Sequence, residues 1–213
     1  MIAKLDRKKQ HTKYMVDDIQ CPGVTTIMGE LSKPFLVTWA NQQGLKGINT
    51  ATDREALDIG TIAHFLIESH ISKTEPDLRD YAPVDVDKAK IAFQGYLKLE
   101  EKHKIIYIKN ELSLVSRKHF FGGTCDMYCE IDGLKTLVDF KTSKKIYPEY
   151  FIQCAAYKEL LIENGYPVEQ EYIFRIDKET GNFEDLKLNL TSKEFDFFLL
   201  LQRVYRCRRE LKL

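Results

Sequence analysis

The chain has 213 residues, of which 44% are hydrophobic and 30% are charged, a composition typical of a folded globular protein and not of a disordered one. Its 32 basic and 32 acidic residues give a formal net charge of zero, so the overall basic charge common in nucleic-acid-binding domains is absent. The sequence contains no apolar run long enough for a membrane span, and its five cysteines show no disulfide framework, which favours free thiols in a reducing compartment.

The first part of the chain, residues 1–104, is predicted to be mostly helical. Residues 1–23 have no clear periodicity and end at Pro22-Gly23. Thr25 or Thr26 is a suitable cap for a short helix, and a second helix is expected to begin at Ser32 with Pro34 in its first turn. A long helix over 51–72 and another near 85–102 follow. The apolar stripe of the long helix consists of Ala56, Ile59, Ala63, Leu66, Ile67 and Ile71.

Residues 105–213 are predicted to form a sheet core and a C-terminal helix. The expected elements, in order, are a strand over 105–115, a hairpin over 122–142, a helix over 148–164, strands over 168–177 and 182–189, and a helix over 192–211. Thr191 and Glu194 form a capping box for the last helix. This order predicts one α/β domain over 1–213, with a mixed sheet that contains an antiparallel hairpin and is flanked by helices, plus a helical N-terminal region.

The hairpin brings charged side chains together. If Asp132-Gly133 forms a two-residue turn, paired residue numbers add to 265, so that Asp126 lies opposite Asp139 and Lys141 points to the same side. Opposed like charges destabilise a hairpin, and a divalent cation between them would remove that repulsion. The alternative is a solvated surface hairpin in which Lys141 neutralises Asp139. The other face should be core, and it contains Cys125, Met127, Cys129 and Ile131 against Leu134, Thr136, Val138 and Phe140.

Two carboxylates at this spacing suit a hard cation with oxygen ligands, such as Mg²⁺ or Mn²⁺. Such an ion can act as a Lewis acid and generate a nucleophile from water for phosphodiester hydrolysis. On the predicted long helix, Gly60, His64 and Glu68 share one face, where His64 could bind the same metal and Gly60 would allow close approach of another element. The alternative for His64 is an ordinary packed histidine.

The helix after the hairpin places Gln153 and Tyr157 one turn apart, with small residues between them. Their polar ends could orient the lysine, a water molecule or a DNA phosphate. The alternative is a helix with one amphipathic side.

The order G-x3-H-x3-E, G-G-T-x-D, D-F-K and Q-x3-Y resembles the RecB-like branch of the PD-(D/E)XK nuclease superfamily, over residues 58–160. Upstream, GVTTIMGELSKPFLVTWA is similar to the opening of phage and mitochondrial exonucleases of that branch. The resemblance implies a restriction-endonuclease-like core and a metal-dependent site. The implied metal ligands are His64, Asp126, Asp139 and the backbone carbonyl of Phe140, with Lys141 as the catalytic lysine and Gln153 and Tyr157 in support.

Two further acidic residues have open roles. Glu111 lies at a strand position where such nucleases often have an acid, and it either approaches a second metal or is an ordinary exposed glutamate. Glu68 is either an accessory to His64 or a helix surface residue.

The implied function is a Mg²⁺- or Mn²⁺-dependent DNA exonuclease of a bacterium or phage, acting in the cytoplasm in recombination, repair or replication. Its substrate would be single-stranded DNA or a duplex end. Because there is no P-loop, strand separation would need a helicase or recombination partner, and because there is no C-x2-C, no iron–sulfur cluster is expected. The alternatives are a structure-specific endonuclease with the same site and a catalytically silent nucleic-acid-binding module. The expected DNA contacts, which could equally be solvated charges, are Lys144, Lys145, Arg203, Arg206 and Arg209.

Overall fold

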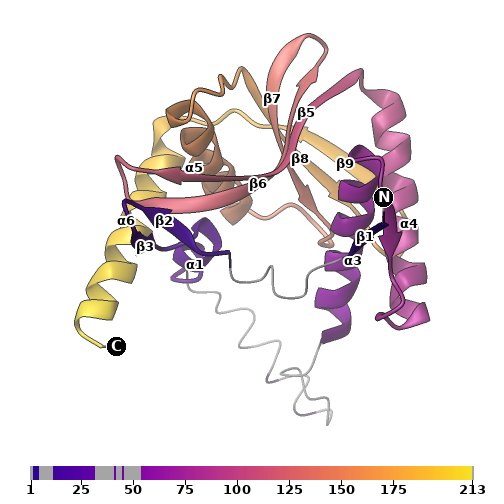
Figure 1. The fold of residues 1–213 in the computed structure, drawn as a ribbon, viewed down its shortest axis with the longest axis horizontal. Helices are drawn as coiled ribbons and strands as arrows, with labels where there is room; N and C mark the ends of the chain where they lie inside the picture. The colour runs from indigo at the N-terminus through magenta and orange to yellow at the C-terminus, as the bar shows by residue number, and fades with distance from the viewer. Residues whose placement is uncertain (1, 5–11, 32–40, 42–44, 46–53, 213) are drawn as a thin grey trace.

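The computed structural model describes residues 2–4, 12–31, 41, 45 and 54–212. Its centre is a five-stranded mixed sheet in the order β5-β6-β7-β8-β9, and Figure 1 shows helices on both sides of it. The strands are β5 (Ile105–Ser116), β6 (Phe121–Ile131), β7 (Leu134–Lys141), β8 (Gln170–Ile176) and β9 (Phe183–Lys187). This confirms the predicted α/β class with an antiparallel hairpin flanked by helices.

The connections follow directly from the order of elements. Strands β5, β6 and β7 form an antiparallel meander, and β8 then pairs with β7 in parallel, because α5 (Glu149–Glu163) carries the chain back along the sheet. Strand β9 returns antiparallel to β8. The remaining helices are α1 (Val24–Met28), α3 (Arg54–Ile71), α4 (Pro83–Lys102) and α6 (Ser192–Glu210).

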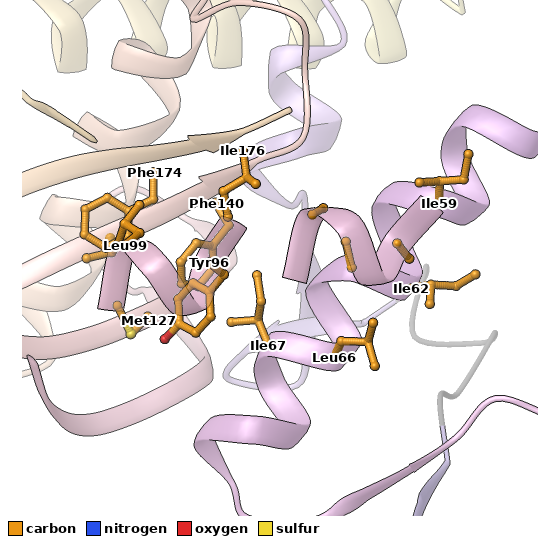
Figure 2. Close-up of a cluster of buried hydrophobic side chains, with 14 of the residues drawn as sticks. Ile59, Ile62, Leu66, Ile67, Tyr96, Leu99, Met127, Phe140, Phe174 and Ile176 are labelled. Atoms are coloured by element: carbon orange, nitrogen blue, oxygen red, sulfur yellow. The ribbon is translucent and has the colours of Figure 1, made fainter. Parts of the chain in front are cut away.

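Helices α3 and α4 cover one face of the sheet. Their apolar side chains pack with those of the sheet in one buried cluster, where Tyr96 and Phe174 are fully buried and Tyr96 lies edge-on to Phe140 with ring centroids 5.5 Å apart. Figure 2 shows Ile59, Ile62 and Ile67 on α3 facing this cluster. The apolar stripe predicted for the long helix is therefore its buried face wherever its side chains are described.

Helices α1, α5 and α6 cover the opposite face. Tyr128 and Leu137 point to this face and pack against Leu160 and Phe198, all of them buried. The face of the hairpin that was predicted to carry charge therefore also carries buried apolar side chains. The sheet is covered on both sides, and Asp139, near the end of β7, is only 1% exposed.

The hairpin turn has the geometry that the Asp-Gly pair favours. Asp132 and Gly133 both have positive φ, 53° and 84°, as a type I′ turn requires. The paired residues from Ile131–Leu134 to Met127–Val138 keep the sum of 265. The predicted register is therefore confirmed for this part of the hairpin.

The β6–β7 ladder ends one residue before the expected aspartate pair. Met127–Val138 is its last pair, so Asp126 and Asp139 are not opposed within the ladder as predicted. Cys125 packs in the cluster on the α5 side, whereas Met127 packs on the α3 side, so the expectation that they share a face is also wrong. A regular strand would place residues two apart on the same face, and the chain therefore departs from regular pleating at Asp126.

The neighbouring strand is irregular at the same level. The β5–β6 register shifts between Tyr107 and Lys109, and Glu111 has a φ of 47°, which is uncommon for a residue with a side chain. Asn110 donates a hydrogen bond at 2.9 Å to Oγ of Ser72, the residue directly after α3, while Leu112 packs on the opposite side of the sheet. Both strands thus leave regular geometry where Glu111 and Asp126 lie.

The N-terminal part differs from its prediction. Residues expected to be irregular form β2 (Tyr14–Val16) and β3 (Ile19–Cys21), an antiparallel pair joined at Asp17-Asp18, whose φ angles are 47° and 64°. Two more short strands, β1 (Ile2–Lys4) and β4 (Glu75–Asp77), pair in parallel. Helix α1 begins after Gly23 and not after a capping threonine. The helix expected from Ser32 lies outside the described residues.

The C-terminal helix begins as its sequence predicts. The side chain of Thr191 accepts a hydrogen bond from the amide of Lys193, and Glu194 accepts one from the amide of Thr191 at 2.9 Å. None of the helices in the described ranges combines the length and the apolar character that crossing a membrane requires.

Candidate functional site

A cleft of about 930 Å³ opens where the pleating of β5 and β6 is broken. Its walls come from α3, from β5, β6 and β7, from α5, from the segment 12–26 and from the end of α6. The cleft brings together seven of the residues singled out in the sequence: His64, Glu111, Asp126, Asp139, Lys141, Gln153 and Tyr157.

At Asp126, where the β6–β7 ladder has ended, a side-chain hydrogen bond connects the two strands. Its Oδ2 accepts a hydrogen bond from the amide of Phe140 at 2.8 Å and lies 3.9 Å from Nδ1 of His64. Burial raises the pKa of the Asp126 carboxyl, and the charge of Lys141 and the amide of Phe140 only partly oppose this. The break in the sheet therefore holds a carboxylate between β7 and α3, at an energetic cost.

Asp139 and Lys141 form a buried ion pair on β7. The Asp139 side chain is 1% exposed, and its Oδ2 contacts Nζ of Lys141, while Oδ1 accepts no hydrogen bond from the residues that the structure describes. Burial raises the pKa of Asp139 to about 6, since the repulsion by Asp126 offsets part of the attraction by Lys141. An unsatisfied carboxylate oxygen this deeply buried is costly unless a ligand completes it.

Lys141 is held as a cation. Burial acts to lower its pKa, but the charges of Asp139 and Asp126 outweigh burial and raise the pKa to about 12. Its ammonium also lies 5.0 Å from the centre of the Tyr150 ring, a cation–π distance. Lys141 is therefore a fixed positive charge in the cleft and not a proton acceptor near neutral pH.

His64 lies on α3 with its ring edge-on to Phe140, centroids 6.1 Å apart. Burial is the main cause that lowers the pKa of His64 to about 4, and the charge of Lys141 lowers it further. The charge of Asp139 and a hydrogen bond to the backbone of Phe140 act in the opposite direction but are weaker. Because that hydrogen bond favours the protonated ring, its acceptor is the Phe140 carbonyl. His64 is neutral at pH 7, and Asp126, His64 and the Phe140 carbonyl meet at one place.

Helix α5 places Gln153 and Tyr157 on the opposite wall. Nε2 of Gln153 donates to the Tyr157 hydroxyl at 2.9 Å. Burial, followed by repulsion from Asp139 and Asp126, raises the pKa of Tyr157 well above its ordinary value, so the hydroxyl stays protonated. The helix can approach this closely because residue 123 is glycine, where an added Cβ would lie 2.8 Å from the Tyr157 ring.

These side chains are of the chemical types that bind a divalent cation, but they are not arranged around a common point. Within the described ranges, no three His, Cys, Asp or Glu side chains stand together as they would around a metal ion. The Lys141 ammonium rests against Asp139, which is the carboxylate that would bind such an ion. The free Oδ1 of Asp139, the Asp126 carboxylate, the Phe140 carbonyl and neutral His64 are the donor types that Mg²⁺ or Mn²⁺ accepts.

The accessory residues Gly60, Glu111 and Glu68 differ in their position relative to the cleft. An added Cβ at Gly60 would lie 3.0 Å from Oγ1 of Thr142, so α3 does approach the end of β7 closely there. Glu111 lines the cleft, whereas Glu68 does not, and the Glu68 backbone carbonyl lies 3.4 Å from Nδ2 of Asn110.

The cations predicted to contact DNA also lie in different parts of the molecule. Arg209 lines the cleft, but Arg203 and Arg206 do not. Arg206 donates to the carbonyl of His119 at 2.9 Å and so ties α6 to the β5–β6 turn. Lys144 and Lys145 lie on the loop after β7, also outside the cleft lining, and the Lys145 ammonium lies 5.2 Å from the centre of the Tyr147 ring.

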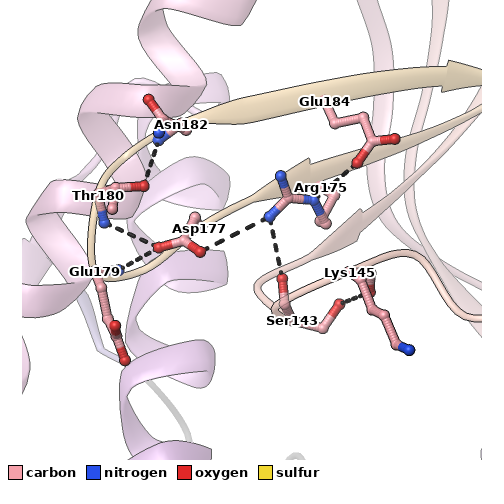
Figure 3. A network of polar contacts seen from close by, with 8 residues as sticks. All are labelled: Ser143, Lys145, Arg175, Asp177, Glu179, Thr180, Asn182 and Glu184. Atoms are coloured by element: carbon pink, nitrogen blue, oxygen red, sulfur yellow. Dashed lines mark hydrogen bonds and ion pairs between the residues drawn. The ribbon is translucent and has the colours of Figure 1, made fainter.

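That loop is held by Arg175, which stands beside Lys141 in the parallel β7–β8 register. Figure 3 shows the Arg175 guanidinium between Glu184, at 3.1 Å, and the carbonyl of Ser143, at 3.4 Å. Asp177 lies 3.9 Å from the same guanidinium. Arg175 therefore fixes the chain directly after the cleft lysine.

Sequence reasoning missed the wall formed by residues 12–26. Tyr14 lies over Gly122, and its hydroxyl shares a hydrogen bond with Oγ1 of Thr124 at 3.0 Å. Pro22 accepts a hydrogen bond from the amide of Gly122, which fixes the segment to β6. The available signal was the pair Gly122-Gly123 itself, since two adjacent glycines in a strand indicate close approach of other groups from both faces.

Comparisons with known proteins show only a weak similarity to solved structures. No protein-family model and no curated protein matches the sequence significantly. Among solved structures, the protein SSO0001 matches at 13% identity and a TM-score of 0.38, over 70% of this chain and 72% of its own.

Two of the similar structures carry exonuclease descriptions. One, from Eubacterium rectale and provisionally described as an exonuclease, matches at 17% identity and a TM-score of 0.42, over 84% of this chain and 66% of its own. The other, LHK-Exo in complex with dAMP, matches at 10% identity and a TM-score of 0.37, over 76% of this chain and 87% of its own.

Proposed function

We propose that this chain is a divalent-metal-dependent nuclease that hydrolyses DNA phosphodiester bonds from an end. The observation that carries the proposal is the buried Asp139 carboxylate, whose Oδ1 has no hydrogen-bond partner among the described residues, beside Asp126, His64 and Lys141 in one cleft. A buried acid with an unsatisfied oxygen, a second acid and a fixed cation are costly for the fold, and such groups cluster at functional sites.

The residues divide into a metal-binding group and a substrate-binding group. Asp126, Asp139, the Phe140 carbonyl and His64 would hold Mg²⁺ or Mn²⁺, which supplies Lewis acidity toward phosphate and water when bound. Among the described residues, Glu111 is the remaining acid that lines the cleft, and we include it as a candidate for a second ion. A cation bound by Asp139 would replace its contact with Lys141, whose ammonium would then be available to the substrate.

The chain's own side chains then account for the remaining steps. A water molecule attacks phosphorus, the bond from phosphorus to the 3′-oxygen breaks, and that oxygen takes up a proton, leaving a 5′-phosphate and a 3′-hydroxyl. Protonated Lys141 stabilises the negative charge that grows on the phosphate oxygens. The Gln153–Tyr157 pair remains neutral and can orient the water or a phosphate oxygen by hydrogen bonding.

Degradation of end-labelled DNA tests the proposal. We expect the purified protein to degrade single-stranded or duplex DNA with Mg²⁺ or Mn²⁺ and not with a chelator. We expect Lys141→Ala to lower the rate by about 10²–10³-fold, the usual effect of removing one group that stabilises transition-state charge. Lys98→Ala, on the exposed side of α4, is the matched control and should leave the rate unchanged.

Two outcomes would contradict the proposal: no degradation with either metal, or full activity in Lys141→Ala. A covalently closed single-stranded circle separates the two modes of cutting, because an exonuclease leaves it intact and an endonuclease opens it. Isothermal titration with Mn²⁺ separates both enzymes from a silent binding module, which would bind DNA without binding the metal.

A further inference from the structure

The arginines near the end of α6 have different contacts. Arg208 pairs with Oε2 of Glu30 at 2.7 Å, and Arg206 donates to the backbone of the β5–β6 turn. Both fix the helix to the rest of the protein. Arg209 instead lines the cleft, with its guanidinium carbon 5.8 Å from the centre of the Tyr205 ring, which lines the cleft as well.

The N-terminal segment adds a second cation and a second aromatic ring to the lining of the cleft. Lys13 and Tyr14 both line it, and Tyr14 is held by its hydrogen bond to Thr124, two residues before Asp126. Within the described ranges, neither Lys13 nor Arg209 is seen in an ion pair with a carboxylate. The lining of the cleft thus runs from the buried Asp139 to the exposed Lys13 and Arg209.

The size of the cleft limits what can enter. About 930 Å³ lies within the usual range for small-molecule pockets, which is roughly 300–1,000 Å³. A volume of this size can take a few nucleotides of one strand. Single strands are commonly held by cations that bind the backbone together with aromatic rings that stack on bases.

We propose that Arg209 and Tyr205 form a nucleotide subsite for single-stranded nucleic acid, at the outer end of the cleft whose inner end holds Asp139 and Lys141. This inference rests on the proposed function for the identity of the ligand. Arg209 binds a phosphate and Tyr205 stacks on the adjoining base, while Lys13 offers a second cation in the same cleft.

The cation–π contact between Arg209 and Tyr205 explains why these two residues would act together. A guanidinium over an aromatic ring loses less freedom when it binds a phosphate, because the ring already limits its orientations. The planar guanidinium can also donate two parallel hydrogen bonds to one phosphate, which a lysine cannot. A nucleotide would therefore meet a prepared surface at the end of α6.

Binding of a fluorescent single-stranded oligonucleotide, followed by anisotropy in the Lys141→Ala background, tests the subsite without cleavage. We expect Arg209→Ala and Tyr205→Ala each to raise the dissociation constant by at least about fivefold, since stacking on one base contributes about 1–3 kcal/mol. Tyr205→Phe should bind nearly normally because it keeps the ring. Lys193→Ala, which removes a charge from the exposed start of the same helix, is the matched control.

The inference is overturned if Arg209→Ala binds as tightly as its parent with an unchanged thermal midpoint, or if Lys193→Ala loses as much affinity. It is also overturned if a blunt duplex of equal length binds as tightly as the single strand. Cleavage assays separate the two proposals. A wild-type protein that cleaves DNA while Arg209→Ala keeps its affinity refutes the subsite alone, and a wild-type protein that binds through Arg209 without cleaving refutes the nuclease alone.

Discussion

Asp126 illustrates how a carboxylate of the candidate site is kept at the expense of stability. Its raised pKa means that the folded protein disfavours the charged form relative to the unfolded chain, mainly because the carboxyl is buried. The contribution of such a group to stability is fully present below its unfolded pKa and is lost as the pH rises through its folded pKa. At neutral pH the ionised side chain therefore destabilises the fold.

We accordingly expect Asp126→Asn to raise the thermal midpoint at pH 7 without divalent metal, while nuclease activity is lost. Asparagine keeps an oxygen that can accept the Phe140 amide and removes the charge. Each kcal/mol gained would raise the midpoint by about 2–4 °C for a chain of this size. The gain should shrink as the pH falls toward the ordinary carboxyl value of 3.8. A lower midpoint at pH 7, measured by scanning calorimetry, would contradict this account.

The turn between β5 and β6 depends on a carboxylate at the end of α5. Glu163 accepts hydrogen bonds from Ser116 Oγ at 2.5 Å and from the amides of Arg117 and Lys118 at 2.8 and 3.1 Å. Burial acts to raise the pKa of Glu163, but these hydrogen bonds together lower it below its ordinary 4.5. The carboxylate thus joins α5 to the turn that also receives Arg206 of α6.

For a lowered pKa, the stabilisation is present above the unfolded value and is lost as the pH falls through the folded value. We expect Glu163→Gln to cost about 1 kcal/mol at pH 7, a modest figure because the side chain is solvent-screened. The difference from wild type in urea unfolding should disappear as the solution is acidified below pH 4.5. A difference that stays constant with pH would show that the charge of Glu163 is not involved.

The pair Gly122-Gly123 decides whether the β2–β3 hairpin can lie against β6. An added Cβ at Gly122 would lie 2.3 Å from the Tyr14 ring, so Gly122→Ala must displace the hairpin. We expect weaker oligonucleotide binding and a loss of about 1–3 kcal/mol in stability, as is usual for overpacking. Adding Tyr14→Gly removes the Tyr14 Cβ, which would lie 2.4 Å from the new Cβ, together with the ring. The double variant should therefore be more stable than the sum of the two single changes predicts.

The elements differ in how far the sequence could foretell them. The register of β6 and β7 was predictable because one turn, Asp132-Gly133, sets it together with two alternating strands. Its interruption at Asp126 was not, because it depends on the left-handed backbone of Glu111 in a neighbouring strand. The short strands β2 and β3 have three residues each, too few for periodicity to show.

The sequence predicted which residues belong to the candidate site better than it predicted how they are arranged. His64, Asp126, Asp139, Lys141, Gln153 and Tyr157 do line one cleft, as their motif order suggested. The direct contact of Lys141 with Asp139 and the wall containing Tyr14 depend on tertiary packing that no local pattern encodes. Among the predicted DNA-binding arginines, only packing could separate Arg209 in the cleft from Arg206 at the turn.

The molecule as a whole has no net charge, so attraction of a polyanion depends on the cleft. The cations that line it are Lys13, Lys141 and Arg209. Three contacts to single-strand phosphates predict a slope of about −2 in a plot of log affinity against log salt. We expect fluorescence titrations between low and physiological salt to give this shallow slope, and Arg209→Ala to reduce it by about 0.7. A steep slope would place the bound strand on a larger surface.

The two sides of the cleft come from opposite ends of the chain. Tyr14 and Thr124, which share a hydrogen bond, are 110 positions apart, and Glu30 and Arg208 are separated by 178. Closing loops of this length costs more chain entropy than forming the β6–β7 hairpin, and contacts so distant in sequence tend to form late in folding. An oligonucleotide that binds only the completed cleft would therefore detect the last step of refolding. Its binding signal should appear after the circular dichroism signal of the sheet has reached its native value.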